Sequence, residues 1–251
     1  MKLLLASLLL FLIPLASSAD EPRYRCYELR TYHAAEGKLE ALHARFRDHT
    51  LGLFEKHGMK NLYYWMPEAN EGQTLVYLLA YPDRDARESS WKAFLADPDW
   101  QAAKAESEKD GKLVAKVESR LLHPTDYSPQ AVEWDNTTPH LFEMRVYRTL
   151  PGRLAALDDR FRQHTVKLFT QHGMTNLIYF HLDEDQEGAD STLVYFLAHA
   201  SHEAQAASFQ AFRSDPAWIA VREASEKDGK IVVENGVTST LLLATDYSPV
   251  K

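Results

Sequence analysis

Apolar and polar residues alternate over residues 25–32, which predicts a β-strand that is half buried. Two further strands are predicted at 61–66 and 74–81, because a polar segment containing Gly72 separates them as in a hairpin. A fourth strand is predicted over residues 113–122.

Helices are predicted between these strands. Positions on one stripe of an amphipathic helix recur every three or four residues, namely Leu39, Leu42, Phe46, His49, Leu53 and His57. This helix should end at Gly58, which suits a left-handed C-cap. Asp83 should cap a second helix, and Asp97 followed by Pro98 should begin a third that ends at Gly111.

The second half of the chain repeats the first. The matched segments include Tyr27-Glu-Leu-Arg-Thr-Tyr32 and Phe142-Glu-Met-Arg-Val-Tyr147, His57-Gly58-Met59 and His172-Gly173-Met174, and Thr125-Asp-Tyr-Ser-Pro129 and Thr245-Asp-Tyr-Ser-Pro249. Each half has the order strand, helix, strand, strand, helix pair, strand. This order predicts an α+β fold in which each half is a ferredoxin-like βαββαβ domain, with its helices on one face of an antiparallel sheet.

A single copy of such a domain would leave the other face of its sheet bare. We therefore expect two domains, 20–128 and 140–251, joined by a linker at 129–139. They should pack sheet to sheet as an intramolecular α/β barrel. The chain would then be an intramolecular pseudo-dimer, and any homo-oligomer would form through its outer surfaces.

Residues 1–19 have the order of a secretory signal peptide, with Lys2, an apolar run over 3–15, and small residues before a cleavage site after Ala19. The apolar run is shorter than a membrane span, and Pro14 interrupts it. The sequence therefore predicts export to the periplasm or the extracellular space, without membrane association after cleavage.

Composition narrows the choice of partners. The net charge is −8 and opposite charges are interspersed, which argues against nucleic acid and anionic membranes as partners. Cys26 is the only cysteine, so stability must come from packing and not from an intramolecular disulfide. Asn136 begins an Asn-Thr-Thr glycosylation pattern, which is common by chance.

Together these pieces resemble two tandem NIPSNAP domains of the dimeric α/β-barrel superfamily. The resemblance rests on the Tyr-Glu-Leu-Arg-Thr-Tyr strand, the long helix ending at His57-Gly58, the aromatic hairpin, and Asp-Pro-x-Trp at Asp97 and Asp215. It covers almost the whole chain after residue 19. It implies a ferredoxin-like fold, paired sheets that form a barrel, and relatives that include small-molecule monooxygenases and haem-handling proteins. The resemblance does not imply a defined enzymatic reaction.

The first strand carries the first candidate site. Successive side chains of a strand point to opposite faces, and the apolar set that begins with Tyr27 is expected to face the helices. The alternate set would then point into the barrel, namely Glu28, Arg30 and Tyr32 with Glu143, Arg145 and Tyr147 of the copy. Charges there must be paired. They are either salt bridges that fill the interface between the sheets or a polar site for a ligand with a carboxylate or phenolate.

The second candidate site is on the long helices. His49 and His164 lie on the predicted apolar stripes and should face the sheet or the cleft beside it. Each is either a hydrogen-bonded core residue or a base, proton donor, metal ligand or haem ligand. The remaining candidates either serve the fold or contact a ligand, and they are Asn61, Tyr64, Asn176 and Tyr179.

The sequence contains no zinc-ligand spacing, phosphate-binding glycine loop or nucleophile elbow. We expect no metal and no cofactor, with haem as an alternative. The leading hypothesis is an exported protein that binds a small, largely apolar molecule in a cleft or in the barrel interior. One alternative is a cofactor-independent oxygenase or isomerase that uses His49 or His164, and a second is a purely structural interaction protein.

Overall fold

The computed structural model describes residues 24–129 and 140–251 of the chain. The predicted signal peptide, Asn136 and all of the predicted linker except residue 129 lie outside these residues.

The elements of the first half are β1 (Cys26–Ala34), α1 (Leu39–Arg45), the π-helix η1 (Phe46–Thr50), α2 (Leu51–Lys56), β2 (Lys60–Pro67), β3 (Thr74–Tyr81), α3 (Arg84–Ala96), α4 (Pro98–Ser107) and β4 (Val114–Pro124). Those of the second half are β5 (Leu141–Thr149), α5 (Leu154–Arg160), the π-helix η2 (Phe161–Thr165), α6 (Val166–Gln171), β6 (Thr175–Leu182), β7 (Thr192–His199), α7 (His202–Ser214), α8 (Pro216–Ser225) and β8 (Val232–Ala244).

The predicted strands and helices are present, and the helix caps form as expected. The amide of Ala86 donates to Asp83 Oδ1 over 2.8 Å, and the amide of Asp99 donates to Asp97 Oδ1 over 2.8 Å. Pro98 is the first residue of α4. These caps satisfy amides that have no partner within the helix, so α3 and α4 begin where the sequence predicts.

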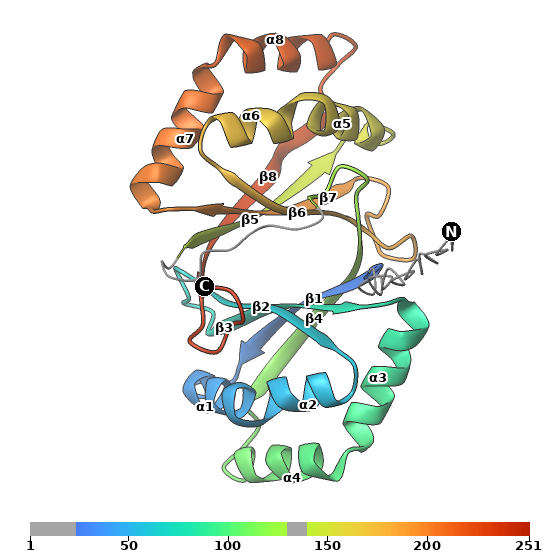
Figure 1. Ribbon diagram of the computed structural model, residues 1–251, viewed down its shortest axis with the longest axis vertical. Coiled ribbons are helices and arrows are strands. Elements are labelled where there is room, and N and C mark those ends of the chain that lie inside the picture. The colour runs from blue at the N-terminus through green and yellow to red at the C-terminus, as the bar shows by residue number, and fades with distance from the viewer. Residues whose placement is uncertain (1–23, 130–139) are drawn as a thin grey trace, which may run out of the picture.

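The eight strands form one closed barrel in the order β1-β3-β2-β8-β5-β7-β6-β4, and all neighbours are antiparallel. The halves meet at two seams, where Trp65 of β2 pairs with Ala244 of β8 and Leu122 of β4 pairs with Leu182 of β6. Helices α1–α4 cover one side of the barrel and α5–α8 cover the opposite side (Figure 1). The prediction that the halves close on each other within one chain is confirmed, and the closure is made by strand pairing.

In the part of the chain that the structure describes, buried side chains form three clusters. The N-terminal helix layer lies between the first half's strands and α1–α4 and includes Tyr77. The C-terminal helix layer is its counterpart in the second half and includes Tyr195. The barrel core lies inside the barrel and includes Leu29, Trp65 and Phe196. Because both of their faces are covered in this way, all residues of β3 and β7 are buried.

The predicted orientation of β1 is wrong. Glu28 accepts a hydrogen bond from Trp91 Nε1 of α3 over 2.7 Å, and the guanidinium of Arg30 lies 4.4 Å from the centre of the Trp91 ring. Tyr32 packs in the N-terminal helix layer, whereas Leu29 of the alternate face lies in the barrel core. The same correction applies to Glu143, Arg145 and Tyr147, which face α7 and the C-terminal helix layer. Both faces of these strands are covered, so the alternation of polarity does not indicate which face the helices cover.

The predicted orientation of His49 and His164 is also wrong, because both side chains are exposed. They lie in the π-helical turns η1 and η2, where the hydrogen-bonded ring contains one more residue than in an α-helix. The extra residue rotates the buried stripe, so Thr50 is buried next to His49. The hydroxyl of Thr50 donates to the carbonyl of Arg45 over 3.1 Å.

The repeated Thr-Asp-Tyr-Ser-Pro segments, 125–129 and 245–249, form exchanged tails that each dock on the other half of the chain. The amide of Thr245 donates to the carbonyl of Tyr64 over 2.9 Å, and the amide of Tyr64 donates to Ser248 Oγ over 3.0 Å.

The copy repeats these contacts on the second half. The amide of Thr125 donates to the carbonyl of Tyr179 over 2.9 Å, and the amide of Tyr179 donates to Ser128 Oγ over 3.0 Å. The Tyr127 hydroxyl donates to Asp158 Oδ1 over 2.7 Å. Each helix layer is therefore completed by a segment from the opposite half.

The isolated segment 20–128 should pair with a second copy of itself, because without the second half its β2 and β4 edges are unpaired. Light scattering after size-exclusion chromatography should report a dimer for this segment and a monomer for the chain from residue 20 to 251. A soluble monomeric segment that unfolds cooperatively would contradict the role assigned to the two seams.

The histidine at the first tail contact should make stability depend on pH. His43 Nδ1 lies 2.7 Å from the Tyr247 hydroxyl, and burial lowers the pKa of His43 below 6.5. Because the folded pKa is below the unfolded one, its contribution to stability is complete above pH 6.5 and is lost as the pH falls through the folded pKa. Urea unfolding should show a smaller loss of stability on acidification in His43→Gln than in the wild type.

The matched control is His49→Gln, since His49 is exposed on the same helical segment. This variant should keep the pH dependence of the wild type. If His43→Gln keeps it as well, the tail contact does not carry the effect.

Candidate functional site

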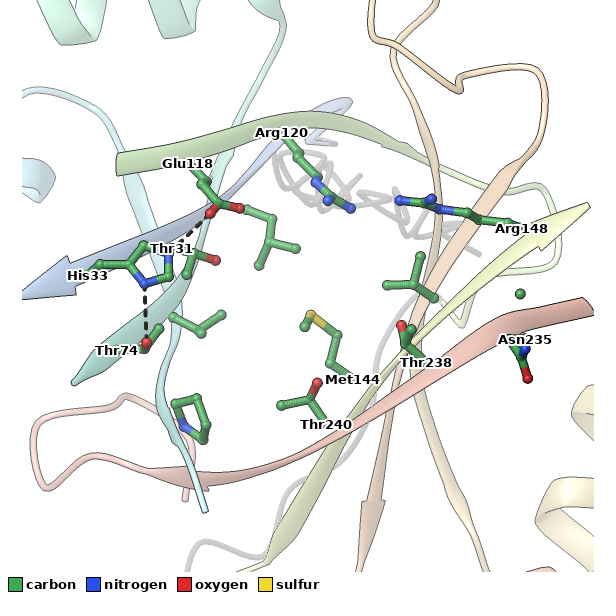
Figure 2. Close-up of a pocket in the computed structure, with 15 residues that line it drawn as sticks. Thr31, His33, Thr74, Glu118, Arg120, Met144, Arg148, Asn235, Thr238 and Thr240 are labelled. Carbon is green, nitrogen blue, oxygen red and sulfur yellow. Dashed lines mark hydrogen bonds and ion pairs between the residues drawn. The ribbon is translucent and has the colours of Figure 1, made fainter. Parts of the chain in front are cut away.

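One end of the barrel interior is hollow. The cavity has a volume of about 480 Å³ and is lined by residues of β1–β5 and β8, so both halves of the chain contribute to its wall (Figure 2). Its apolar lining consists of Leu29, Pro67, Val76, Met144 and Val146.

The wall becomes more polar along each strand. The side chains of β1 that face the interior read Tyr27, Leu29, Thr31 and His33, and the first two belong to the barrel core. On β5 the corresponding series is Phe142, Met144, Val146 and Arg148. The large side chains fill one end of the interior, and smaller and polar ones leave the cavity at the other end.

A hydrogen-bonded group of polar side chains forms one part of the cavity wall (Figure 2). His33 Nε2 lies 3.1 Å from Glu118 Oε1, and His33 Nδ1 lies 3.5 Å from Thr74 Oγ1. Lys116 Nζ lies 2.7 Å from the same Glu118 oxygen. The hydrogen bond from Lys116, followed by that from His33, lowers the pKa of Glu118, so this carboxylate is charged and engaged.

Two arginines face each other in another part of the wall. Arg120 of β4 and Arg148 of β5 point toward one another, as Figure 2 shows. Neither forms a salt bridge with any residue in the part of the chain that the structure describes, and both also line a neighbouring hollow of about 410 Å³. Glu187 lines that second hollow but pairs with neither arginine.

A bulge in β8 holds the strand end beside Arg148. The register of the β5–β8 ladder shifts between Tyr147 and Thr149, and Asn235 has a φ of 56°. A Cβ at Gly236 would lie 2.7 Å from the carbonyl oxygen of Arg148, so only glycine fits this approach. The β1–β4 ladder also shifts register at the corresponding place, between His33 and Ala34, but there Lys116 is still the ladder partner of His33.

The predicted charged candidates form a buried cluster outside the cavity. Glu28 accepts hydrogen bonds from Arg30 Nη1 over 2.5 Å, from Arg87 Nη2 over 2.8 Å and from Ser119 Oγ over 2.6 Å. Burial acts to raise the pKa of Glu28, but the hydrogen bond from Arg87 and the charge of Arg30 outweigh it and lower the pKa to about 2. Arg30 is paired with a carboxylate as predicted, and its side chain is largely buried, with 13% of its surface exposed.

The second half builds the same cluster with different partners. Glu143 pairs with Arg145 and accepts hydrogen bonds from His199 Nε2 over 3.0 Å, Gln205 Nε2 over 3.1 Å and Ser239 Oγ over 2.6 Å. Burial again opposes ionisation, yet these bonds and Arg145 lower the pKa of Glu143 to about 2. Arg145 is likewise paired as predicted and largely buried, with 14% of its side-chain surface exposed.

The predicted asparagine and tyrosine candidates connect strands to helices. The Tyr64 hydroxyl donates to Asn61 Oδ1, and Asn61 Nδ2 donates to the carbonyl of Leu51 over 3.0 Å. In the copy, the Tyr179 hydroxyl donates to Asn176 Oδ1, and Asn176 Nδ2 donates to the carbonyl of Val166 over 3.0 Å.

None of the residues predicted to bind a ligand lines the cavity, and the exposed His49 and His164 do not line it either. Their roles in binding or catalysis stay predictions. The polar residues that do line it were missed, and they are Thr31, His33, Thr74, Glu118, Arg120, Arg148, Asn235, Thr238 and Thr240. A signal was present in the repeat, because His33 corresponds to Arg148 and Arg120 corresponds to Thr240, whereas Glu28, Arg30 and Tyr32 have identical counterparts.

Within residues 24–129 and 140–251, no three His, Cys, Asp or Glu side chains are grouped so as to hold a metal ion. In the same residues, no helix has both the length and the apolar character needed to cross a membrane.

A closed antiparallel barrel with helices on its outside is the architecture of dimeric α/β-barrel proteins, here made within one chain. The sequence profile of the NIPSNAP family matches residues 27–129 and 142–249. The chain therefore belongs to the NIPSNAP family and carries two NIPSNAP domains in tandem.

Solved structures with a similar fold cover most of the chain. A candidate monooxygenase from Lactobacillus acidophilus NCFM has a TM-score of 0.58 and 10% identity, over 88% of this chain and 94% of that chain. An anthrone oxidase-like protein has a TM-score of 0.54 and 10% identity, over 89% and 92% of the two chains. A NIPSNAP domain protein from Burkholderia xenovorans is 25% identical over 41% of this chain and 98% of its own, with a TM-score of 0.37. At such identities the first two support the fold alone, and no curated protein matches the sequence.

Replacing Glu28 with Gln should destabilise the fold by about 3–5 kcal/mol, because Arg30 would remain buried without its carboxylate partner. The folded pKa of Glu28 is about 2 against an ordinary 4.5, so the wild-type carboxylate stabilises the fold above pH 4.5 and this stabilisation is lost as the pH falls to about 2. Denaturant unfolding should therefore show the largest difference at neutral pH and a shrinking difference below pH 4.5.

Asp246→Asn is the control for this prediction, since it removes an exposed partner of Arg47. Exposed pairs contribute little to stability, so its unfolding midpoint should stay close to that of the wild type. Equal effects of Glu28→Gln and Asp246→Asn would contradict the burial assigned to the cluster.

Proposed function

We propose that this NIPSNAP protein binds a small, largely apolar molecule in the barrel interior. The observation that carries the proposal is the cavity of about 480 Å³ at one end of a barrel whose other end is filled. Protein sites for small molecules are typically about 300–1,000 Å³, mostly apolar, and provided with a few polar groups. The cavity has this character, with apolar side chains on several strands and threonine hydroxyls between them.

The barrel suits a preformed site. Every strand is hydrogen bonded to two neighbours, so the wall does not depend on a loop that must first be ordered. The threonines that line the cavity are Thr31, Thr74, Thr238 and Thr240. Their hydroxyls can both donate and accept, which orients a bound molecule without burying an unpaired charge.

Further parts of the proposal concern the wider protein. Each half is best described as a ferredoxin-like unit, which the strand order β4-β1-β3-β2 and its copy β8-β5-β7-β6 support.

The order of residues 1–19 supports export, so the protein would meet its ligand outside the cytoplasm. The chain would act without a cofactor of its own. The haem alternative stays a prediction, and His33, which lines the cavity, lies 3.1 Å from Glu118 Oε1 and 3.5 Å from Thr74 Oγ1.

A cofactor-independent oxygenase or isomerase stays the second candidate function. The observation in its favour is His33, an imidazole on the cavity wall that Glu118 positions over 3.1 Å. A histidine held in this way can accept a proton from a bound substrate. Oxygen uptake with electron-rich aromatic compounds would support it, provided that His33→Gln abolishes the uptake and still binds a neutral probe.

Filling the cavity should abolish binding. N-phenylnaphthylamine is an uncharged probe whose fluorescence rises in apolar sites, and the wild-type protein should bind it saturably. Val146→Trp places an indole in the cavity and should weaken this binding at least about tenfold by direct overlap.

Val237→Trp is the matched control. Val237 lies on the neighbouring strand β8 and is 39% exposed on the outside of the barrel, so its replacement should leave probe binding unchanged. Equal binding by the wild type and Val146→Trp would show that the probe binds elsewhere and would overturn the proposed site.

A further inference from the structure

The two arginines of the cavity wall make an unusual pair. Arg120 comes from β4 of the first half and Arg148 comes from β5 of the second, and their guanidinium groups point toward each other (Figure 2). The more deeply buried Arg30 and Arg145 each reach a carboxylate, whereas neither Arg120 nor Arg148 does so within the described residues. Two cations that face each other without a counter-charge repel, and an anion placed between them would remove the repulsion.

The nearby carboxylates are not available to them. Glu118, two residues before Arg120 on β4, is engaged by His33 and Lys116. Glu187 lies in the adjoining hollow and pairs with neither arginine. A negatively charged group of a ligand would therefore be attracted to this pair of arginines.

The pair also breaks the twofold repetition of the barrel. Arg120 corresponds to Thr240 in the repeat, and Arg148 corresponds to His33, so neither repeat position holds a second arginine. A molecule with one acidic group would enter this barrel in a single orientation. Its apolar part would extend toward Leu29 and Met144, which lie at the boundary with the barrel core.

We propose that the ligand is a carboxylic acid with an apolar body, and that Arg120 and Arg148 together hold its carboxylate. The inference rests on the proposed function, because it names the chemistry of the molecule bound in the same cavity. Guanidinium groups suit this task, since each presents parallel N–H donors that match the two oxygens of a carboxylate.

Two molecules that share an alkyl chain and differ in their head group test whether the site recognises a carboxylate. Decanoate and decanol are each used to displace N-phenylnaphthylamine from the full-length mature chain at low ionic strength. The wild type should bind decanoate at least about tenfold more tightly than decanol, and added salt should reduce this preference. In Arg120→Gln/Arg148→Gln the preference should disappear, because the affinity for decanoate should fall at least about tenfold further than the affinity for decanol.

Arg222→Gln removes one positive charge from the exposed surface of α8 and serves as the control. It should keep the preference for decanoate. Arg148 is exposed, so Arg148→Gln should fold even if the double variant does not. This single variant should lose a large part of the preference for decanoate.

The outcomes separate the two proposals. If the probe binds and Val146→Trp abolishes binding, but decanoate has no advantage over decanol in the wild type, the cavity site stands and the acid-binding inference fails. A preference that survives in Arg148→Gln and in the double variant also overturns the inference. If the wild type binds neither the probe nor decanoate, both proposals fail.

Discussion

The rest of the structure depends on the pairing of strand edges between the two halves. Neither half can pair both edge strands of its own sheet, because β2 pairs with β8 and β4 pairs with β6. The pairing turns two open sheets into one barrel, and this gives the interior a wall on every side. It also carries the last strand of each half across the seam, which places the exchanged tails on the opposite helix layer.

Much of the fold follows from local features of the sequence. Caps at Asp83 and Asp97 and the apolar run of β3 are local signals, so the bounds of these elements could be predicted closely. The repeat further indicated that the bare faces of two sheets would meet in one chain. What the pattern could not show was the orientation of β1, because a strand covered on both faces has no solvent face to define the other.

Local sequence patterns could not place the histidines of the π-helical turns or find the charged residues of the cavity. A helical period of 3.6 residues does not reveal a π-helical turn, and this is why His49 was placed on the wrong side of its helix. The repeat directed attention to residues that are the same in both halves, such as Glu28 and Glu143. In the structure these residues hold helices to the sheet, and the cavity has its charged groups where the halves differ. The charged residues shared by both halves therefore serve packing, whereas His33, Arg120 and Arg148 of the cavity have no identical counterpart.

The exchanged tails have a consequence for how the molecule is made. Tyr247 follows β8 in the second half, yet it completes the helix layer of the first half through His43. A ribosome delivers the first half long before this tyrosine emerges, so the nascent domain must wait with an unfinished layer and unpaired strand edges. The first half can therefore be completed only after the tail that follows β8 has been made, so assembly of its helix layer lags behind its synthesis.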